Sequence, residues 1–98
     1  MDRKYDLPEN IKDEIAEYAE KYGVTKVILF GSRARCTNHE RSDIDIAVAD
    51  GDFNEFCYAM DEEVHTLLMF DVVYLNSCRS AELISEIKKD GITIYEKV

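Results

Sequence analysis

The chain has 98 residues, a formal net charge of −9 and 46% hydrophobic residues, which predicts one small folded domain over residues 1–98. No apolar run approaches the about 20 residues that a membrane helix needs, and the charged start MDRKYDLPEN lacks the apolar core of a signal peptide. We therefore expect a cytoplasmic protein without a membrane segment. The acidic balance argues against non-specific binding to nucleic-acid phosphates and suits cations or a basic protein partner.

Helical spacing and strand-forming runs alternate along the chain. Ile11, Ile15 and Ala19 recur at helical spacing after Pro8, and Gly23 ends this pattern. Later runs are rich in β-branched and aromatic residues, as buried strands are. The first half of the chain is predicted to contain a helix between Pro8 and Gly23, a strand over 25–30, a turn or short helix over 32–38, a polar connector over 39–42 and a strand over 43–49. A helix capped by Asp52 follows, and its apolar stripe runs from Phe53 to Leu68. The remaining elements are a strand over 70–75, a helix over 81–89 capped by Ser80 and followed by Gly91, and an edge strand over 92–95.

This order predicts an α/β domain, a small mixed sheet of about four strands covered by helices. The connector before residue 43 is ambiguous, so the relative direction of the first two strands stays open. Three cysteines, Cys36, Cys57 and Cys78, have no CxxC spacing. We interpret them as reduced thiols rather than as a disulfide frame or a zinc site.

Acidic and apolar residues alternate in the second predicted strand, SDIDIAV. Asp43 and Asp45 therefore face one side of the sheet, and the isoleucines beside them face the other. Two carboxylates about 4 Å apart repel by about 4 kcal/mol at an effective dielectric constant of about 20, and a cation between them removes this cost. Asp71, inside the apolar run FDVVYL, joins the pair if its strand lies beside the second strand. Hard cations such as Mg²⁺ take oxygen ligands of this kind.

Gly31 and Ser32 follow the first predicted strand and are suited to cradle a phosphate. Glycine lets the backbone approach a ligand closely, and the N–H groups and serine hydroxyl can donate hydrogen bonds. Arg33 and Arg35 could add charge-assisted bonds to the same phosphates. A plain turn explains the Gly-Ser pair alone, whereas the pair together with the strand aspartates predicts a site for metal-assisted chemistry at phosphorus.

The segment GSRAR, followed by SDIDIAV and then by FDVVYL, resembles the minimal nucleotidyltransferases of the DNA polymerase β superfamily over nearly the whole chain. The resemblance implies a nucleotidyltransferase core like the palm of polymerase β. It implies that Asp43, Asp45 and Asp71 ligate two Mg²⁺ ions and that Asp71 also activates the attacking hydroxyl. ATP or another nucleoside triphosphate is the implied substrate. The expected nucleotide-binding residues are Gly31, Ser32, Arg33, Arg35 and Ser42.

One residue departs from the pattern of that family. Members commonly read GSRARG, whereas Cys36 stands where the second glycine would be. Glycine takes a positive φ readily and cysteine does so reluctantly. We therefore expect a remodelled turn, which bears on nucleotide affinity and not on the metal site.

The resemblance also implies a partner. Small members of the superfamily often pair with a HEPN-domain ribonuclease toxin encoded nearby, and some act as antitoxins by transferring AMP from ATP to a tyrosine of that toxin. A chain of 98 residues has little surface beyond the catalytic core. Recognition of the acceptor is therefore expected to come from the partner or from oligomerisation.

These observations support three hypotheses. The first is an Mg²⁺-dependent nucleotidyltransferase, specifically an adenylyltransferase acting on a partner protein. The second is a non-catalytic antitoxin whose acidic surface masks a basic ribonuclease, which the net charge and Cys36 favour. The third is nucleotidyl transfer to a small hydroxylated molecule, as in the aminoglycoside-modifying relatives. We rank the third lower because those enzymes usually carry an added helical domain.

Overall fold

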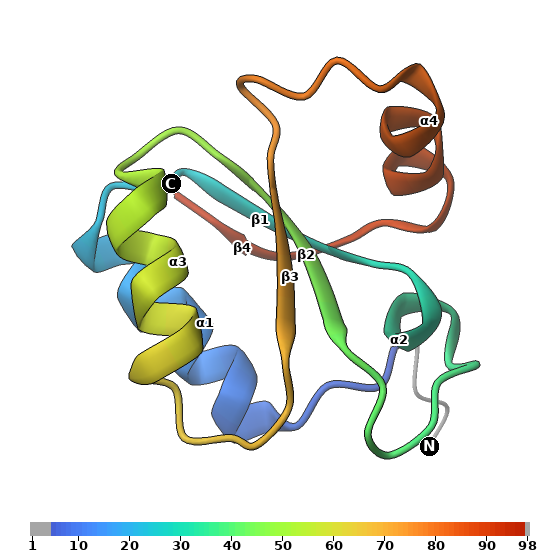
Figure 1. Ribbon diagram of the computed structural model, residues 1–98, viewed down its shortest axis with the longest axis horizontal. Helices are drawn as coiled ribbons and strands as arrows, with labels where there is room; N and C mark the ends of the chain where they lie inside the picture. Colours follow the sequence, from blue (N-terminus) through green and yellow to red (C-terminus); the bar gives the residue numbers. More distant parts are fainter. Residues whose placement is uncertain (1–4, 98) are drawn as a thin grey trace.

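Helices and strands alternate through residues 5–97, the part of the chain that the computed structural model describes. In chain order they are α1 (Glu9–Lys21), β1 (Lys26–Phe30), α2 (Ser32–Arg35), β2 (Ile44–Ala49), α3 (Phe53–Glu62), β3 (Phe70–Tyr74), α4 (Ala81–Asp90) and β4 (Ile92–Glu96) (Figure 1). The predicted order is confirmed, and the segment after β1 begins with a short helix. Within residues 5–97, the helices are all too short or too polar to span a bilayer. The charged start of the chain includes residues 1–4, which lie outside the described residues.

The sheet has the strand order β3-β2-β1-β4, so β4 lies at an edge as predicted. β1 pairs antiparallel with β2 and with β4, whereas β2 pairs parallel with β3. The direction of the first two strands, left open by the sequence, is therefore antiparallel. Parallel strands need a crossover connection, and α3 lies in the connection between β2 and β3. The expected mixed α/β sheet is confirmed.

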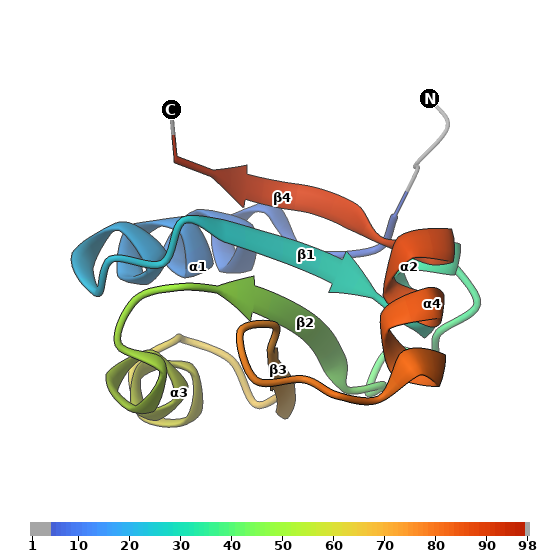
Figure 2. The same ribbon diagram turned by 90° about the horizontal axis from the view of Figure 1, so that it is seen from above.

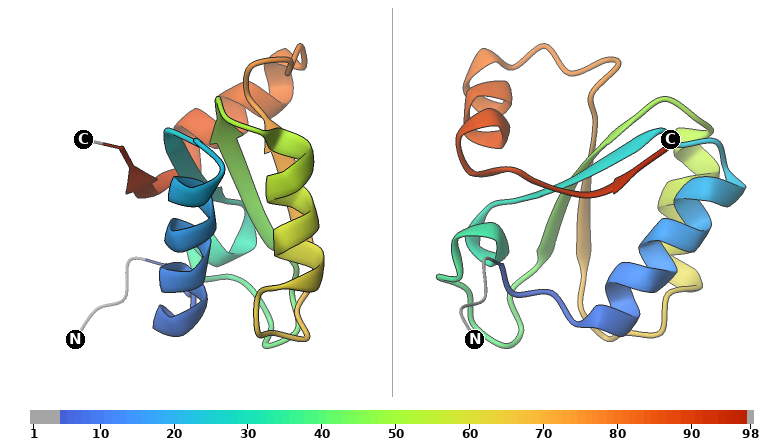
Figure 3. Two further views of the ribbon diagram at one scale, coloured as in Figure 1. Left: turned by 90° about the vertical axis from the view of Figure 1, so that its left-hand side faces the viewer. Right: turned by 180° about the vertical axis from the view of Figure 1, so that it is seen from behind.

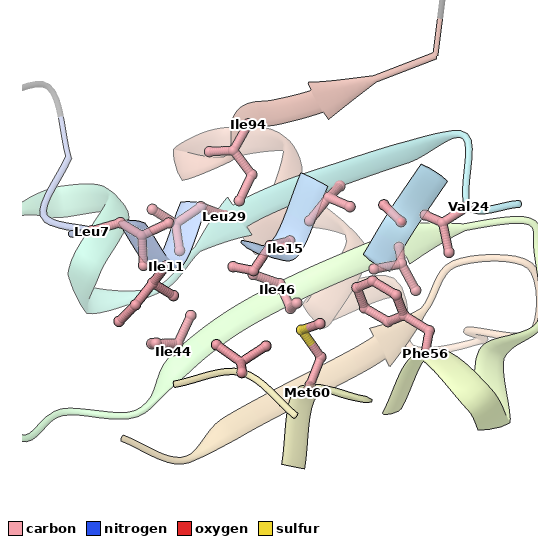
Figure 4. Packing of buried hydrophobic residues seen from close by; sticks show 14 of the residues in the cluster. Leu7, Ile11, Ile15, Val24, Leu29, Ile44, Ile46, Phe56, Met60 and Ile94 are labelled. Atoms are coloured by element: carbon pink, nitrogen blue, oxygen red, sulfur yellow. The ribbon is translucent and has the colours of Figure 1, made fainter. Parts of the chain in front are cut away.

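The main core lies between the sheet and the helices α1 and α3. Alternation along β2 sends Ile44, Ile46 and Val48 to this face, where all three are fully buried. They pack with apolar side chains of both helices, among them Ile15 and Phe56 (Figure 4). The two helices lie side by side on this face (Figure 3). Burying one such side chain stabilises the fold by about 1.5–3 kcal/mol. The packing of both helices against this face of the sheet therefore contributes strongly to the stability of the fold.

The opposite face of the sheet carries less cover. Phe30, Ala47 and Ile87 form a second, smaller buried cluster there, and Ile87 belongs to α4. α4 and α2 lie across the molecule from α1 and α3 (Figure 2). Val73 of β3, which packs against this smaller cluster, is only half-buried. A ligand can therefore reach the sheet from this face.

The helix predicted to carry an apolar stripe up to Leu68 ends at Glu62, so that prediction is wrong in its last part. The N–H of Val64 donates to the carbonyl of Ala59 and closes the final turn. Val64 is buried as the stripe requires, but Leu67 is fully exposed, at 102%. The last part of the predicted apolar stripe therefore does not pack in the core.

The pairing of β3 explains why the helix stops. The N–H of Ile44 donates to the carbonyl of Met69 at 2.8 Å, which places Met69 beside the start of β2. The N–H of His65 donates to the carboxylate of Glu14 on α1. The chain must turn at this point to enter β3, because a helix continued to Leu68 could not also place Met69 in an extended ladder.

Gly91 follows α4, as predicted, for a reason of space rather than of backbone conformation. Its φ is −66°, so the helix does not end in a left-handed residue. A Cβ at this position would collide with the carbonyl of Ile87 and would lie 2.7 Å from Cγ2 of Ile28 on β1. The lack of a side chain therefore lets the end of α4 pack closely on the sheet.

Gly91→Ala should lower the free energy of unfolding by about 1–3 kcal/mol, because the added methyl group overpacks the contact between α4 and β1. Urea denaturation measures the change. Ser85→Ala, at an exposed position of the same helix, is the matched control and should shift stability by no more than about 0.5 kcal/mol. Equal stability of Gly91→Ala and the wild type would contradict the close packing.

Candidate active site

Three neighbouring strands bring the predicted Gly-Ser turn and two of the predicted aspartates into one row. Phe30, at the end of β1, is the register partner of Asp45 on β2, and Asp45 is the partner of Asp71 on β3. Gly31 directly follows Phe30. Because neighbouring strands lie about 4.8 Å apart, the Gly-Ser turn, Asp45 and Asp71 lie side by side. β3 therefore lies beside β2, which is the condition under which the sequence analysis placed Asp71 with Asp45.

The carboxylates lie on the open face of the sheet. Alternation puts Asp45 and Asp71 on the same face as Ala47 and Val73, opposite the main core. Asp43 immediately precedes β2 and is exposed, as is Asp71, whereas Asp45 is half-buried. The row is thus accessible to a ligand.

Asp45 is held in an unfavourable electrostatic environment. Burial raises the pKa of its carboxyl, and the carboxylate of Asp71 raises it further. Asp43 and Glu86 act in the same direction, while the charge of Arg35 opposes them. Like charges disfavour the ionised form. A divalent cation at this row would favour that form instead, because it would be the largest local charge.

The donor chemistry of the row fits Mg²⁺. Asp43, Asp45 and Asp71 are all carboxylates, the ligands that hard cations prefer. Within residues 5–97, no three His, Cys, Asp or Glu side chains are already gathered closely enough to hold a metal ion. Mg²⁺ usually keeps several waters and takes one or two carboxylates together with substrate phosphates. The adjacent pair Asp45 and Asp71 suits that mode of binding.

Gly31 packs directly against the Asp45 carboxylate. Its backbone has φ 74° and ψ −155°, a conformation that glycine adopts without a steric cost. A Cβ at Gly31 would collide with Oδ2 of Asp45. The following residue, Ser32, is half-buried and begins α2. Backbone that can approach a phosphate and a carboxylate that can hold a cation therefore lie in direct contact.

Arg33 and Ser42, two of the predicted nucleotide-binding residues, make hydrogen bonds with backbone groups of the chain around α2 and the polar connector. Arg33 is only 3% exposed, and its guanidinium donates to the backbone carbonyls of Ser42, Glu40 and Asp6. The hydroxyl of Ser42 accepts a hydrogen bond from the N–H of His39 at 2.8 Å. These contacts hold the polar connector against α2 and guide the chain into β2. The side chains of Arg33 and Ser42 thus bind backbone groups of the chain around the site, and the role predicted for them in nucleotide binding stays a prediction.

Arg35, in contrast, lies close enough to Asp45 to lower the pKa of its carboxyl. Its guanidinium forms an ion pair of 3.2 Å with Asp90 of α4. Glu86, one helical turn before Asp90, also acts on Asp45. Both acids on α4 were missed in the sequence: a spacing of i and i+4 puts them on one helical face, but it does not indicate that this face meets Arg35 and Asp45.

Cys36 ends α2 in the left-handed conformation, with φ 58° and ψ 33°. Its N–H donates to the carbonyl of Arg33, and the N–H of Thr37 donates to that of Ser32. Such helix ends favour glycine, because a Cβ is strained at positive φ. Cys36 therefore has the backbone conformation that favours glycine.

A mixed sheet of this topology, with carboxylates in register on two strands beside a Gly-Ser turn, defines a nucleotidyltransferase domain. Residues 13–98 match the family Polymerase beta, Nucleotidyltransferase. The chain belongs to this family. No curated protein matches the chain.

Solved structures share the fold. A crystal structure of a toxin-antitoxin with AMP-PNP has a TM-score of 0.71 and 24% identity, over 88% of this chain and 73% of that one. A mutant of the toxin-antitoxin MntA-HpeT has a TM-score of 0.70 and 25% identity, over 94% of this chain and 75% of that one. A protein from Sulfolobus solfataricus described as a nucleotidyltransferase has a TM-score of 0.56 and 21% identity, over 90% and 78% of the two chains.

In the absence of divalent cations, Asp45→Asn should raise the free energy of unfolding at neutral pH, because it removes a half-buried charge beside other carboxylates. The folded-state pKa of Asp45 lies above its ordinary value of 3.8. The contribution of Asp45 to the stability of the wild type is therefore lost as the pH rises from that value through the raised folded-state pKa, and it is regained as the pH falls. The gain from Asp45→Asn should shrink as the pH falls through this window, in urea unfolding curves recorded with EDTA.

Added Mg²⁺ should stabilise the wild type more than Asp45→Asn, since the variant has lost one ligand. Asp13→Asn, at an exposed position of α1, is the matched control. A gain in Asp45→Asn that is the same at every pH would contradict the electrostatic explanation.

Cys36→Gly should raise the free energy of unfolding by about 1 kcal/mol. A non-glycine residue in the left-handed region costs about 1–2 kcal/mol, and the greater freedom of glycine in the unfolded chain offsets part of this. Urea unfolding in reducing buffer measures the change, with Cys36→Ala as the matched variant that keeps the Cβ. If the glycine and alanine variants are equally stable, the position is not strained.

Proposed function

We propose that this member of the nucleotidyltransferase family transfers a nucleoside monophosphate, AMP from ATP, to a hydroxyl of a polypeptide in an Mg²⁺-dependent reaction. The proposed acceptor is a tyrosine of a HEPN-domain toxin encoded nearby, so that the chain acts as an antitoxin. The observation that carries the proposal is the row of Gly31, Asp45 and Asp71 across three strands. Similar folds in toxin-antitoxin structures, one of them with AMP-PNP, support the choice of donor and partner.

The nucleotide is proposed to lie with its phosphates at Gly31 and Ser32. The absent side chain of Gly31 lets the turn backbone lie directly against the Asp45 carboxylate, so that a phosphate bound at the turn would lie beside a cation bound at Asp45. Arg35 provides a positive charge in the same region, and charge-assisted bonds from a guanidinium to phosphate are strong. Mg²⁺ bound by Asp43, Asp45 and Asp71 would neutralise both the phosphates and the carboxylates.

Asp71 is proposed to accept the proton of the attacking hydroxyl, because it lies at the outer end of the row and is exposed. The hydroxyl oxygen forms a bond to the α-phosphorus, and the bond from that phosphorus to the bridging oxygen breaks in line with it. Pyrophosphate leaves with the electron pair of the broken bond. Asp71 then releases the proton to solvent, so that the products are the nucleotidylated acceptor and pyrophosphate.

Asp71→Asn should lower the rate of transfer by about 10²-fold or more, because an amide cannot accept the proton and is a poorer ligand for a cation. The assay incubates the protein, Mg²⁺ and the protein encoded beside it with ATP labelled at the α-phosphate. Label should appear on the acceptor from α-labelled and not from γ-labelled ATP. Asp13→Asn should behave as the wild type; equal transfer by Asp71→Asn, or none by the wild type, would refute the proposal.

A second candidate function is non-catalytic masking of a basic partner, which the net charge of −9 favours. The two functions differ in their need for Asp45. If Asp45→Asn neutralises the toxin as well as the wild type does, binding alone is sufficient. If neutralisation is lost while the complex persists, transfer is required and the masking function is excluded.

A further inference from the structure

An apolar ledge lies beside the carboxylate row and takes no part in the chemistry described above. Arg41, Leu67, Leu68 and Met69 line a hollow of about 340 Å³, and we refer to these residues as the ledge. Leu67 is fully exposed, at 102%, and Met69 is 66% exposed. Single exposed apolar residues are common, but adjacent ones that border a hollow are typical of an interaction site.

The exposure of the ledge is fixed by its backbone. The N–H of Leu68 donates to the hydroxyl of Thr66 at 3.1 Å, and the N–H of Thr66 donates to the carbonyl of Val64. The carbonyl of Met69 accepts the N–H of Ile44. The segment is therefore held at both ends while Leu67 projects outward, so the exposed side chain is part of the fold.

The ledge adjoins the acidic row. Ile44, to which Met69 is hydrogen-bonded, lies between Asp43 and Asp45, and Met69 is two residues before Asp71. Arg41 enters the ledge from the connector that leads into β2. A molecule seated on the ledge therefore lies next to the carboxylates.

The strand order assigns the two substrates to opposite ends of the row. The phosphate turn follows β1, Asp45 lies on β2 and Asp71 lies on β3, which has no further strand beyond it in residues 5–97. In an in-line displacement the attacking group stands opposite the leaving group. If the triphosphate lies at the β1 end, the acceptor approaches from the β3 end, where the ledge is.

We propose that the ledge is the docking surface for the polypeptide that supplies the acceptor hydroxyl, an inference that rests on the proposed function. A small hydroxylated acceptor would have no use for apolar side chains outside the row, whereas a polypeptide can place an apolar side chain on Leu67 and Met69. Arg41 provides the ledge with a donor for a carboxylate or carbonyl of the partner. The partner thus carries an apolar anchor and a hydrogen-bond acceptor beside its reactive hydroxyl.

Leu67→Ser tests the inference, because the side chain is exposed and its loss leaves the core intact. With the protein encoded beside this chain as acceptor, kcat/KM should fall by about tenfold or more, as expected for a buried interface anchor. The affinity for ATP with Mg²⁺, measured by equilibrium dialysis, should stay the same. Leu67→Met should restore most of the transfer, and Tyr58→Ser, which removes an exposed apolar side chain of α3, should have no effect.

Several results would overturn the inference. Unchanged transfer by Leu67→Ser, or an equal loss in Tyr58→Ser, would show that the ledge does not select the acceptor. A dimer of the wild type that becomes a monomer in Leu67→Ser without loss of transfer, in sedimentation analysis, would assign the ledge to a second copy of this chain. The absence of transfer by the wild type refutes the proposed function itself and is thereby distinguished from a failure of the ledge alone.

Discussion

Two like charges in register on parallel strands are the constraint on which the site depends. Asp45 and Asp71 are direct partners in the β2–β3 ladder, and burial, together with the repulsion from Asp71, raises the pKa of Asp45. Such a pair persists only where the surrounding structure holds it. The fully buried isoleucines on either side of Asp45 supply this support on the opposite face of β2. The buried apolar face and the acidic face of the sheet therefore both follow from the alternation of acidic and apolar residues along β2.

The short segment between β1 and β2 aligns the turn with the carboxylates. Gly31 and Cys36 both have positive φ and stand on either side of α2, so the chain bends sharply at each end of this helix. The buried guanidinium of Arg33 then binds the connector through backbone carbonyls. Hydrogen bonds from a charged donor are worth about 1.5–3 kcal/mol, so this arginine contributes to the placement of the row without touching it.

The sequence predicts local features of this fold better than features that depend on distant residues. Hydrophobic spacing, the Asp52 and Ser80 caps and the alternation around Asp45 are encoded within a few residues, and the structure has all of them. The end of α3 could not be predicted, because it depends on pairing between Met69 and Ile44 far apart in the chain.

The site residues divide in the same way. The aspartates and the Gly-Ser turn belong to a contiguous motif whose side chains follow from strand alternation, and their adjacency needed only the order of β2 and β3. The contacts of Arg33 could not be predicted, because nothing local reveals that its guanidinium donates to three backbone carbonyls. Asp90 reaches Arg35 across 55 residues of chain, a pairing that helical spacing alone does not indicate.

The apolar residues at which the helical prediction fails are also the ones that we propose to bind the acceptor polypeptide. Leu67 continues the hydrophobic pattern of α3, yet the turn into β3 leaves it exposed, and Met69, which follows the pattern and lies two residues before Asp71, is exposed as well. The same backbone course that sets the third carboxylate in register therefore exposes apolar surface at that end of the row. At the other end, Gly31 provides close backbone approach and no apolar surface of its own. The two ends of the row thus differ in chemistry, and the proposed function uses this difference by placing the phosphates at one end and the polypeptide at the other.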